Sequence, residues 1–110
     1  MKKSTYRSFE GENLSGIIEE SKEQLILLIF TMEWLGINSM LESFLYDLIE
    51  DKSGVSIYQI DVEKNDHLAA EMGISNFPYT LFLKNKEVVD SFAGLISKKK
   101  ISLKLDQHTR

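Results

Sequence analysis

The stretch that decides the fold is LILLIFTMEWLGINSM, residues 25–40. Its first part is a short, nearly continuous apolar run, which predicts a strand covered on both faces over Gln24–Thr31. Its second part changes to helical spacing, and Ser39 with Glu42 predicts a capping box that starts a helix. Proteins often position reactive groups where a strand passes into a connection of this kind. None of the residues Leu35–Asn38 is a plausible nucleophile, acid or base.

The helix expected from Ser39 has an apolar face, and DKSG at residues 51–54 ends it with a turn. That face consists of Met40, Leu41, Phe44, Leu45, Leu48 and Ile49. Upstream, a short first strand is expected at Tyr6–Phe9. It is followed by a short amphipathic helix that carries Leu14, Ile17 and Ile18 and ends near Glu20.

Downstream, Val55–Val62 predicts a second buried strand. A short helix capped by Asn65 or Asp66 then runs through Met72, and Gly73 closes it. After the break at Phe77-Pro78, the strands Tyr79–Lys84 and Glu87–Ala93 form a hairpin around the turn Asn85-Lys86. A last helix, capped by Ser97, reaches about Leu105, with Ile101, Leu103 and Leu105 among its apolar positions.

This order of elements predicts the α/β class. Early strand–helix alternation implies parallel crossovers, and the late hairpin adds antiparallel strands. We therefore expect a central mixed five-stranded sheet flanked by helices on both faces. With 110 residues, the chain has the length of a single domain, residues 1–110.

Composition excludes several classes of function. The net charge is −4, from 13 basic and 17 acidic residues, whereas nucleic-acid binding needs a basic surface. Cysteine is absent, which removes disulfides, thiolate metal sites and thiol catalysis. The first residues lack the apolar segment of a secretory signal, and no apolar run is long enough to span a bilayer. We expect a cytoplasmic protein without nucleic-acid or membrane partners.

Three segments together resemble the thioredoxin family over nearly the whole chain. MEWLGINSM lies where thioredoxins have a Trp-Cys-Gly-x-Cys segment that opens a helix. QIDVEKND and GISNFPYTLFLKNKEVVDSFAG resemble the later strand end and hairpin of that family. The matching positions are Trp34, Gly36, Gly73-Ile74, Pro78, Lys84-Asn85 and Gly94. The resemblance implies a thioredoxin fold.

The departures from that pattern concern the chemistry. Leu35 and Asn38 occupy the places of the two cysteines. Ile29 falls where the family has a buried aspartate, and Gln59 falls where that aspartate has a lysine partner. Since exchange requires a thiolate to attack sulfur, we expect no thiol–disulfide oxidoreductase activity and no catalytic residue.

The resemblance also implies a partner-binding groove. In that fold the proline, here Pro78, is cis, and the backbone of the preceding residue pairs with an extended segment of the partner. The expected partner-binding residues are Trp34, Leu35, Gly36, Ile37, Asn38, Phe77, Pro78, Tyr79, Gly94 and Leu95. Apolar patches and exposed Trp or Tyr often mark interfaces. Three other interpretations stay open: a structural turn at Pro78, side chains that fold back over the loop, and a homodimer.

The other polar and charged residues give weaker indications of a functional site. Asn38 and Ser39 could hold an anion at the helix N-terminus, although capping alone explains both. His67 and His108 are expected to be exposed, the latter in a frayed tail. The run Lys98–Lys100 is interpreted as a solvated first helical turn. Neither a metal-ligand cluster nor a cofactor motif is found in the sequence.

The sequence thus favours a redox-inactive, thioredoxin-like module that binds a protein or peptide segment, with a chaperone-like role. One alternative is a homo-oligomerising structural protein. Another is a family member that takes part in redox homeostasis only through its partners. An enzyme with different chemistry would need a nucleophile, and the only hydroxyls near the groove are those of Thr31, Ser39 and Thr80.

Overall fold

The computed structural model describes residues 3–109, and its elements follow the predicted order. The strands β4 and β5 have the predicted bounds, and the other element ends that differ do so by one to three residues; for example, the last helix runs on to His108. The elements are β1 (Thr5–Ser8), α1 (Leu14–Glu20), β2 (Leu25–Thr31), α2 (Asn38–Ile49), β3 (Val55–Asp61), α3 (Asp66–Glu71), β4 (Tyr79–Lys84), β5 (Glu87–Ala93) and α4 (Lys98–His108).

The five strands form one mixed sheet in the order β1-β3-β2-β4-β5. The strands β1, β3 and β2 run parallel, whereas β4 pairs antiparallel with both β2 and β5. The predicted mixed five-stranded sheet is therefore confirmed. Its central strand is β2, whose seven residues are all buried. This burial explains the continuous apolar run that opens the deciding stretch.

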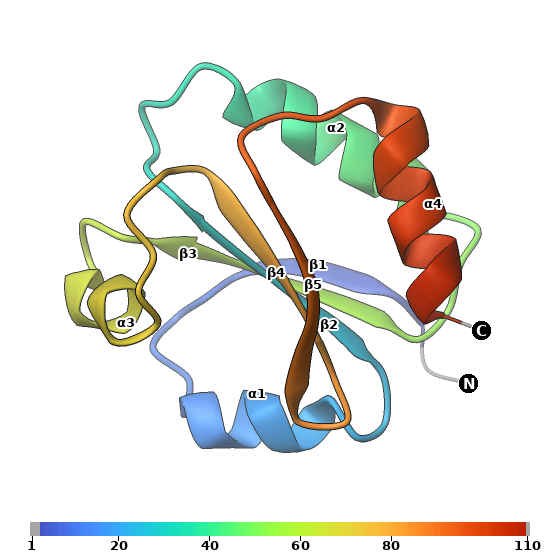
Figure 1. Ribbon diagram of the computed structural model, residues 1–110, viewed down its shortest axis with the longest axis horizontal. Coiled ribbons are helices and arrows are strands. Elements are labelled where there is room, and N and C mark those ends of the chain that lie inside the picture. Colours follow the sequence, from blue (N-terminus) through green and yellow to red (C-terminus); the bar gives the residue numbers. More distant parts are fainter. Residues whose placement is uncertain (1–2, 110) are drawn as a thin grey trace.

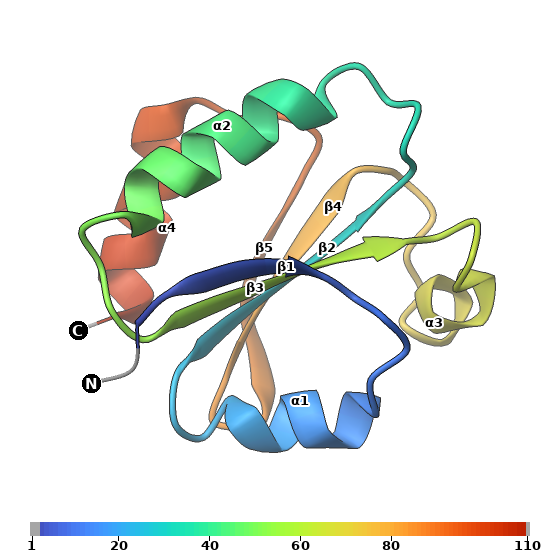
Figure 2. The same ribbon diagram turned by 180° about the vertical axis from the view of Figure 1, so that it is seen from behind.

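Helices cover both faces of the sheet, as Figures 1 and 2 show. Helices α2 and α4 lie over one face, and α1 and α3 lie over the other. Because successive side chains of a strand point to opposite faces, β2 contributes to two cores. Leu25, Leu27 and Ile29 enter the core under α2 and α4, and Ile26, Leu28 and Phe30 enter the core beside α1 and α3.

Two tight turns use left-handed backbone conformations. Asn85 and Lys86 have φ angles of 52° and 70°, which fits the predicted two-residue hairpin turn. Gly73 has a φ angle of 70° and directly follows Met72, the C-cap residue of α3. Because a residue with a Cβ rarely adopts this conformation, glycine at position 73 ends α3 at low cost.

The helix expected near Ser39 begins one residue earlier, but its expected capping box is wrong. The helix begins at Asn38, its N-cap residue is Ile37, and no side chain makes a capping hydrogen bond. The capping box of Ser39 and Glu42 is therefore not formed. The expectation for α4 is confirmed, since the Ser97 hydroxyl accepts a hydrogen bond from the Lys100 backbone N–H at 3.2 Å.

Two residues expected on apolar helix faces are exposed instead. Met40 of α2 and Leu103 of α4 are 53% and 60% exposed. The buried positions of α2 are Leu41, Leu45 and Ile49, four residues apart, and Met40 lies to one side of this line. Among the apolar positions named for α4, Ile101 and Leu105 are fully buried.

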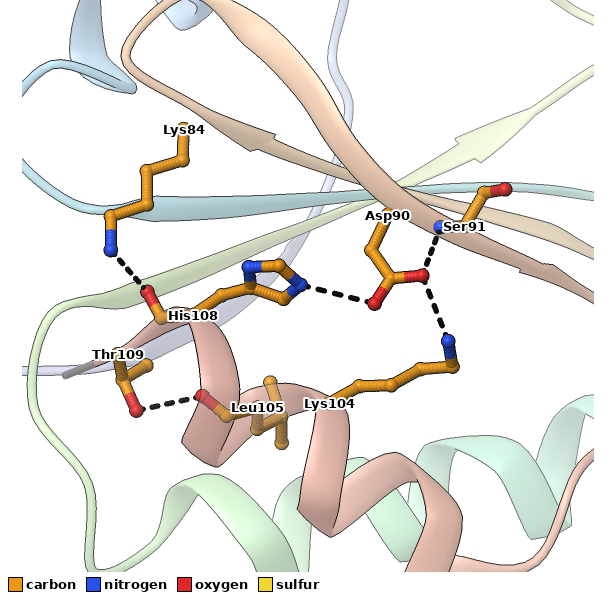
Figure 3. A network of polar contacts seen from close by, with 7 residues as sticks. All are labelled: Lys84, Asp90, Ser91, Lys104, Leu105, His108 and Thr109. Carbon is orange, nitrogen blue, oxygen red and sulfur yellow. Dashed lines mark hydrogen bonds and ion pairs between the residues drawn. The ribbon is translucent and has the colours of Figure 1, made fainter.

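His108 does not lie in a frayed tail. Its side chain is 12% exposed, and its Nε2 lies 3.0 Å from Oδ2 of Asp90 on β5 (Figure 3). Lys104 Nζ donates to the other oxygen of Asp90, at 2.8 Å. Burial alone would raise the pKa of Asp90, but the hydrogen bonds from Lys104 and His108 hold this pKa below its usual value. The network joins the C-terminal helix to the edge strand. His67, in contrast, is exposed as expected.

Within residues 3–109, every helix is too short or too polar to cross a bilayer. The same part of the chain contains no group of three His, Asp or Glu side chains suited to a metal ion.

Candidate functional site

The loop between β2 and α2 lies at one end of the sheet, close to the start of β4 (Figure 1). It consists of residues 32–37 and forms two successive turns. The Leu35 N–H donates to the Met32 carbonyl at 3.1 Å, and the Asn38 N–H donates to the Leu35 carbonyl at 3.2 Å. The end of β2 is held in place from the other side, because the Val62 N–H donates to the Thr31 carbonyl.

The Asn38 side chain fixes this loop to the end of β2. The Thr31 hydroxyl donates to Asn38 Oδ1 at 2.7 Å, and Asn38 Nδ2 donates to the Met32 carbonyl, also at 2.7 Å. Thus the amide neither caps the helix, as one interpretation had it, nor points a free donor at an anion. It satisfies polar groups of the loop itself, which would otherwise lack partners.

Large apolar side chains of this loop face solvent. Trp34 is 67% exposed and Ile37 is 42% exposed, and Met40, three residues after Ile37 in the first turn of α2, is also exposed. These three side chains are called the Trp34 surface below. Leu35 is half-buried and Gly36 is exposed. The interpretation in which Trp34 and Ile37 fold back to close the loop is therefore wrong.

Sequence reasoning assigned Met40 to the core and so missed its place at this surface. The spacing predicts one apolar face for all three residues Met40, Phe44 and Leu48, because positions 40, 44 and 48 lie one above another on a helix. Phe44 and Leu48 are partly buried against the core, whereas Met40, in the first turn, is not covered. The spacing of apolar residues along one helix does not show which of its turns are covered by other parts of the fold.

The second segment of the predicted site is the turn before β4. The Phe77–Pro78 peptide bond is cis, and Pro78 is buried. The Gly94 N–H donates to the Pro78 carbonyl at 2.8 Å, which places Gly94 beside the proline. The described residues offer no hydrogen-bond partner to the Phe77 backbone. Within residues 3–109 the N–H and C=O of Phe77 are therefore not used by the sheet.

The apolar residues expected to surround Pro78 divide among three environments. Phe77 and Tyr79 are half-buried against the core beside α1 and α3. Leu95 is half-buried against the core under α2 and α4. Trp34 and Ile37 remain on the surface. The site thus joins an exposed apolar loop to a partly buried turn.

The positions below the loop contain no ionisable side chain of a thiol relay. Ile29 is 1% exposed and pairs in register with Gln59 on β3 and Thr80 on β4. Gln59 Oε1 accepts a hydrogen bond from the Tyr6 hydroxyl at 2.8 Å. The Thr80 hydroxyl is buried without a partner, and Thr31 donates to an amide rather than to a base. Neither hydroxyl has the activating base that a nucleophile needs.

Two cavities lie away from this loop. One, of about 420 Å³, is lined by Gln24, Lys84 and His108 among others. The other, of about 430 Å³, lies beside β1 and is lined by Tyr6 and Tyr46 among others. Neither includes a residue of the predicted site.

Residues 6–107 match the model of the family described as Thioredoxin. The chain belongs to the thioredoxin family. Two curated thioredoxins show how similar the sequences are. That of Chlorobaculum thiosulfatiphilum is 30% identical over 105 residues, covering 94% of this chain and 92% of the relative. That of Bacillus subtilis strain 168 is 28% identical over 107 residues, covering 96% and 95%.

Solved thioredoxin structures have the same fold. A mutant thioredoxin from Halobacterium salinarum aligns with a TM-score of 0.82 at 21% identity, covering all of this chain and 96% of the other. Thioredoxin from Fasciola hepatica aligns with a TM-score of 0.78 at 24% identity, covering 99% and 100%. The thioredoxin fold expected from the resemblance is confirmed. The chain itself contains no cysteine among its 110 residues.

Proposed function

We propose that this thioredoxin family member is redox-inactive and binds an extended segment of a partner protein, in a chaperone-like role. The binding surface would comprise Trp34–Asn38, Phe77–Tyr79 and Gly94-Leu95. Two observations carry the proposal: the exposed apolar side chains of the Trp34 surface, and a Phe77 backbone with no hydrogen-bond partner among residues 3–109, at the same end of the sheet. An extended peptide can gain main-chain hydrogen bonds from such a segment and apolar contacts from such a patch.

Redox inactivity is proposed because thiol–disulfide exchange needs a thiolate, and this chain has none. The test is the reduction of insulin by dithiothreitol, followed by turbidity. We expect the protein to leave the uncatalysed rate unchanged, even at high concentration. A clear acceleration would show that the chain contributes chemistry other than that of cysteine.

Peptide binding is tested on an array of peptides that samples many sequences, probed with the labelled protein. We expect a subset of spots to bind, and Trp34→Ala to lose most of the signal on this subset, since exposed Trp residues are frequent hot spots. The matched control is Leu103→Ala, which removes another exposed apolar side chain from α4. If Trp34→Ala and Leu103→Ala bind the same spots as the original protein, the proposed surface is wrong.

Self-association is a second candidate, because the Trp34 surface exposes three large apolar side chains that a copy of the chain could cover. Light scattering over a dilution series separates the two candidates. A monomer at every concentration excludes self-association, whereas a dimer that dissociates in Trp34→Ala would favour it over peptide binding.

A further inference from the structure

The charge of the chain is unevenly distributed around the Trp34 surface. The β2–α2 loop, the last residue of β3, the β3–α3 turn and α3 together contain one basic residue, Lys64, and five acidic residues. Elsewhere the chain has the other twelve acidic and twelve basic residues, so these segments account for the whole net charge of −4. The five acidic residues are Glu33, Asp61, Glu63, Asp66 and Glu71. They are called the acidic flank below.

The acidic flank lies at the same end of the sheet as the loop that carries Trp34. Glu33 precedes Trp34 in the loop, and its Oε1 lies 3.9 Å from Lys64 Nζ of the β3–α3 turn. The strand ends below are also neighbours, since Asp61 pairs in register with Thr31. Figures 1 and 2 show the same arrangement, with the turn before α3 and the loop before α2 at one end of the sheet.

Among residues 3–109, the two ion pairs of the acidic flank are long and exposed; in one of them, Asp66 Oδ1 lies 4.0 Å from His67 Nδ1. Glu33 and Lys64 form a long pair, and both side chains are about three-quarters exposed, so solvent screens the contact strongly. Asp61 uses one oxygen to accept the Glu63 N–H, a local hydrogen bond that leaves its charge in place. The flank therefore projects a negative field at this end of the sheet, which salt screens over a Debye length of about 10 Å at 0.1 M.

We propose that the Trp34 surface selects an extended segment in which an apolar side chain is flanked by Lys or Arg. This inference rests on the proposed peptide-binding function and specifies the chemistry of the ligand. The apolar side chain covers Trp34 and Ile37, while the basic residues meet the acidic flank. Charge complementarity of this kind speeds association and excludes acidic competitors.

The same charge distribution argues against a second copy of the chain as the occupant. A two-fold dimer brings the same patch of both copies together. Each Trp34 surface would carry its acidic flank into the interface, where like charges repel one another. A basic peptide meets no such repulsion.

The test uses two dye-labelled peptides that share a Leu- and Val-rich centre, contain no aromatic residue and carry Lys in one case and Glu in the other on both sides. Binding is measured by fluorescence anisotropy at about 0.02 M and about 0.5 M salt. We expect the Lys peptide to bind at least about tenfold more tightly at low salt, and this ratio to shrink at high salt. Since Trp34 is the sole tryptophan, a blue shift of its emission with unlabelled peptide locates the bound segment at the loop.

Charge variants show whether the acidic flank causes the preference. Glu33→Gln with Glu63→Gln should reduce the Lys-to-Glu affinity ratio several-fold. The matched control, Glu50→Gln with Glu87→Gln, makes the same change in charge at exposed positions outside these segments, and it should preserve the ratio.

Each other outcome has a distinct meaning. Equal binding of both peptides, or a ratio that the two double variants reduce alike, overturns the charge inference and leaves the proposed function standing. Failure of these peptides and of every array peptide overturns the proposed function as well. A dimer that competes with the Lys peptide would overturn the choice of a basic segment over a second copy.

Discussion

Asp90 is the residue whose charge couples α4 most directly to the sheet. Its carboxylate accepts hydrogen bonds from Lys104, His108 and the Ser91 N–H, and its side chain is 18% exposed (Figure 3). Asp90→Asn should lower the free energy of unfolding at neutral pH by about 1–3 kcal/mol, as expected for hydrogen bonds to a charged group. The measurement is urea unfolding followed by circular dichroism. The control, Asp47→Asn, breaks an exposed ion pair with Lys98 and should cost less than about 1 kcal/mol.

The stability that Asp90 contributes to the folded protein should depend on pH. The pKa of Asp90 in the folded state lies below its ordinary value of 3.8, so in acid the unfolded chain binds its proton first. The contribution of Asp90 is therefore complete above that value and is lost as the pH falls through the lower, folded pKa. The difference in stability between the original protein and Asp90→Asn should shrink below about pH 4. A difference that stays constant down to about pH 2 would contradict this account.

Ile29 tests whether the strand below the loop tolerates a carboxyl group at this buried position. Its side chain is 1% exposed, so Ile29→Asp buries a carboxyl group and should cost about 2–5 kcal/mol. Burial raises the pKa of that carboxyl, so the variant loses further stability as the pH rises above about 4. Urea unfolding at several pH values measures both effects. Ile29→Asn, which cannot ionise, should be destabilised without this pH dependence; an unaffected Ile29→Asp would refute the argument.

At the scale of residues, the sequence could identify what the site lacks but not how the remaining polar groups are used. The absence of cysteine and the apolar residue at position 29 can be read directly. That Asn38 bonds to Thr31 and Met32 depends on the path of the loop, because a helix cap and a loop brace use the same side-chain groups. His108 was likewise misplaced, since its partner Asp90 is 18 residues away in sequence.

Among the helices, α2 and α4 begin in different ways, and this difference is measurable. Ser97 caps α4 through its hydroxyl, whereas Ser39 is exposed and makes no capping bond. Ser97→Ala should therefore destabilise the protein by about 1 kcal/mol. Ser39→Ala should change stability by less than about 0.5 kcal/mol. Thermal unfolding of the two variants makes the comparison. A larger loss of stability in Ser39→Ala than in Ser97→Ala would indicate that Ser39 caps α2, contrary to the structure.

The element order was predictable because each strand and helix has its own periodicity and its own turn residues. Asn85-Lys86, Gly73 and Ser97 are local signals that act within a few residues, and all three positions have the predicted role. Exposure at helix ends was less predictable. Whether Met40 or Leu103 is covered depends on elements distant in sequence, which the pattern of one helix does not encode.

For the whole molecule, the site and its charge arise from the way the sheet gathers separate segments. Glu33 and Lys64 lie 31 positions apart in the chain, yet parallel pairing of β2 and β3 brings their loops to the same end of the sheet. Composition gave the net charge without its location. The acidic flank emerges only when the crossover connections have placed the ends of both strands together.

The two cores of this molecule should unfold together, because β2 supplies both. Leu27 and Leu28 are adjacent and fully buried, but they face opposite cores. Leu27→Ala and Leu28→Ala should each cost about 2–5 kcal/mol by leaving a cavity. If the sheet couples the cores, each variant shifts one cooperative transition, and circular dichroism and Trp34 fluorescence report the same midpoint. Separate midpoints in either variant would mean that one core unfolds while the other stays folded. In that case β2 does not couple the unfolding of the two cores.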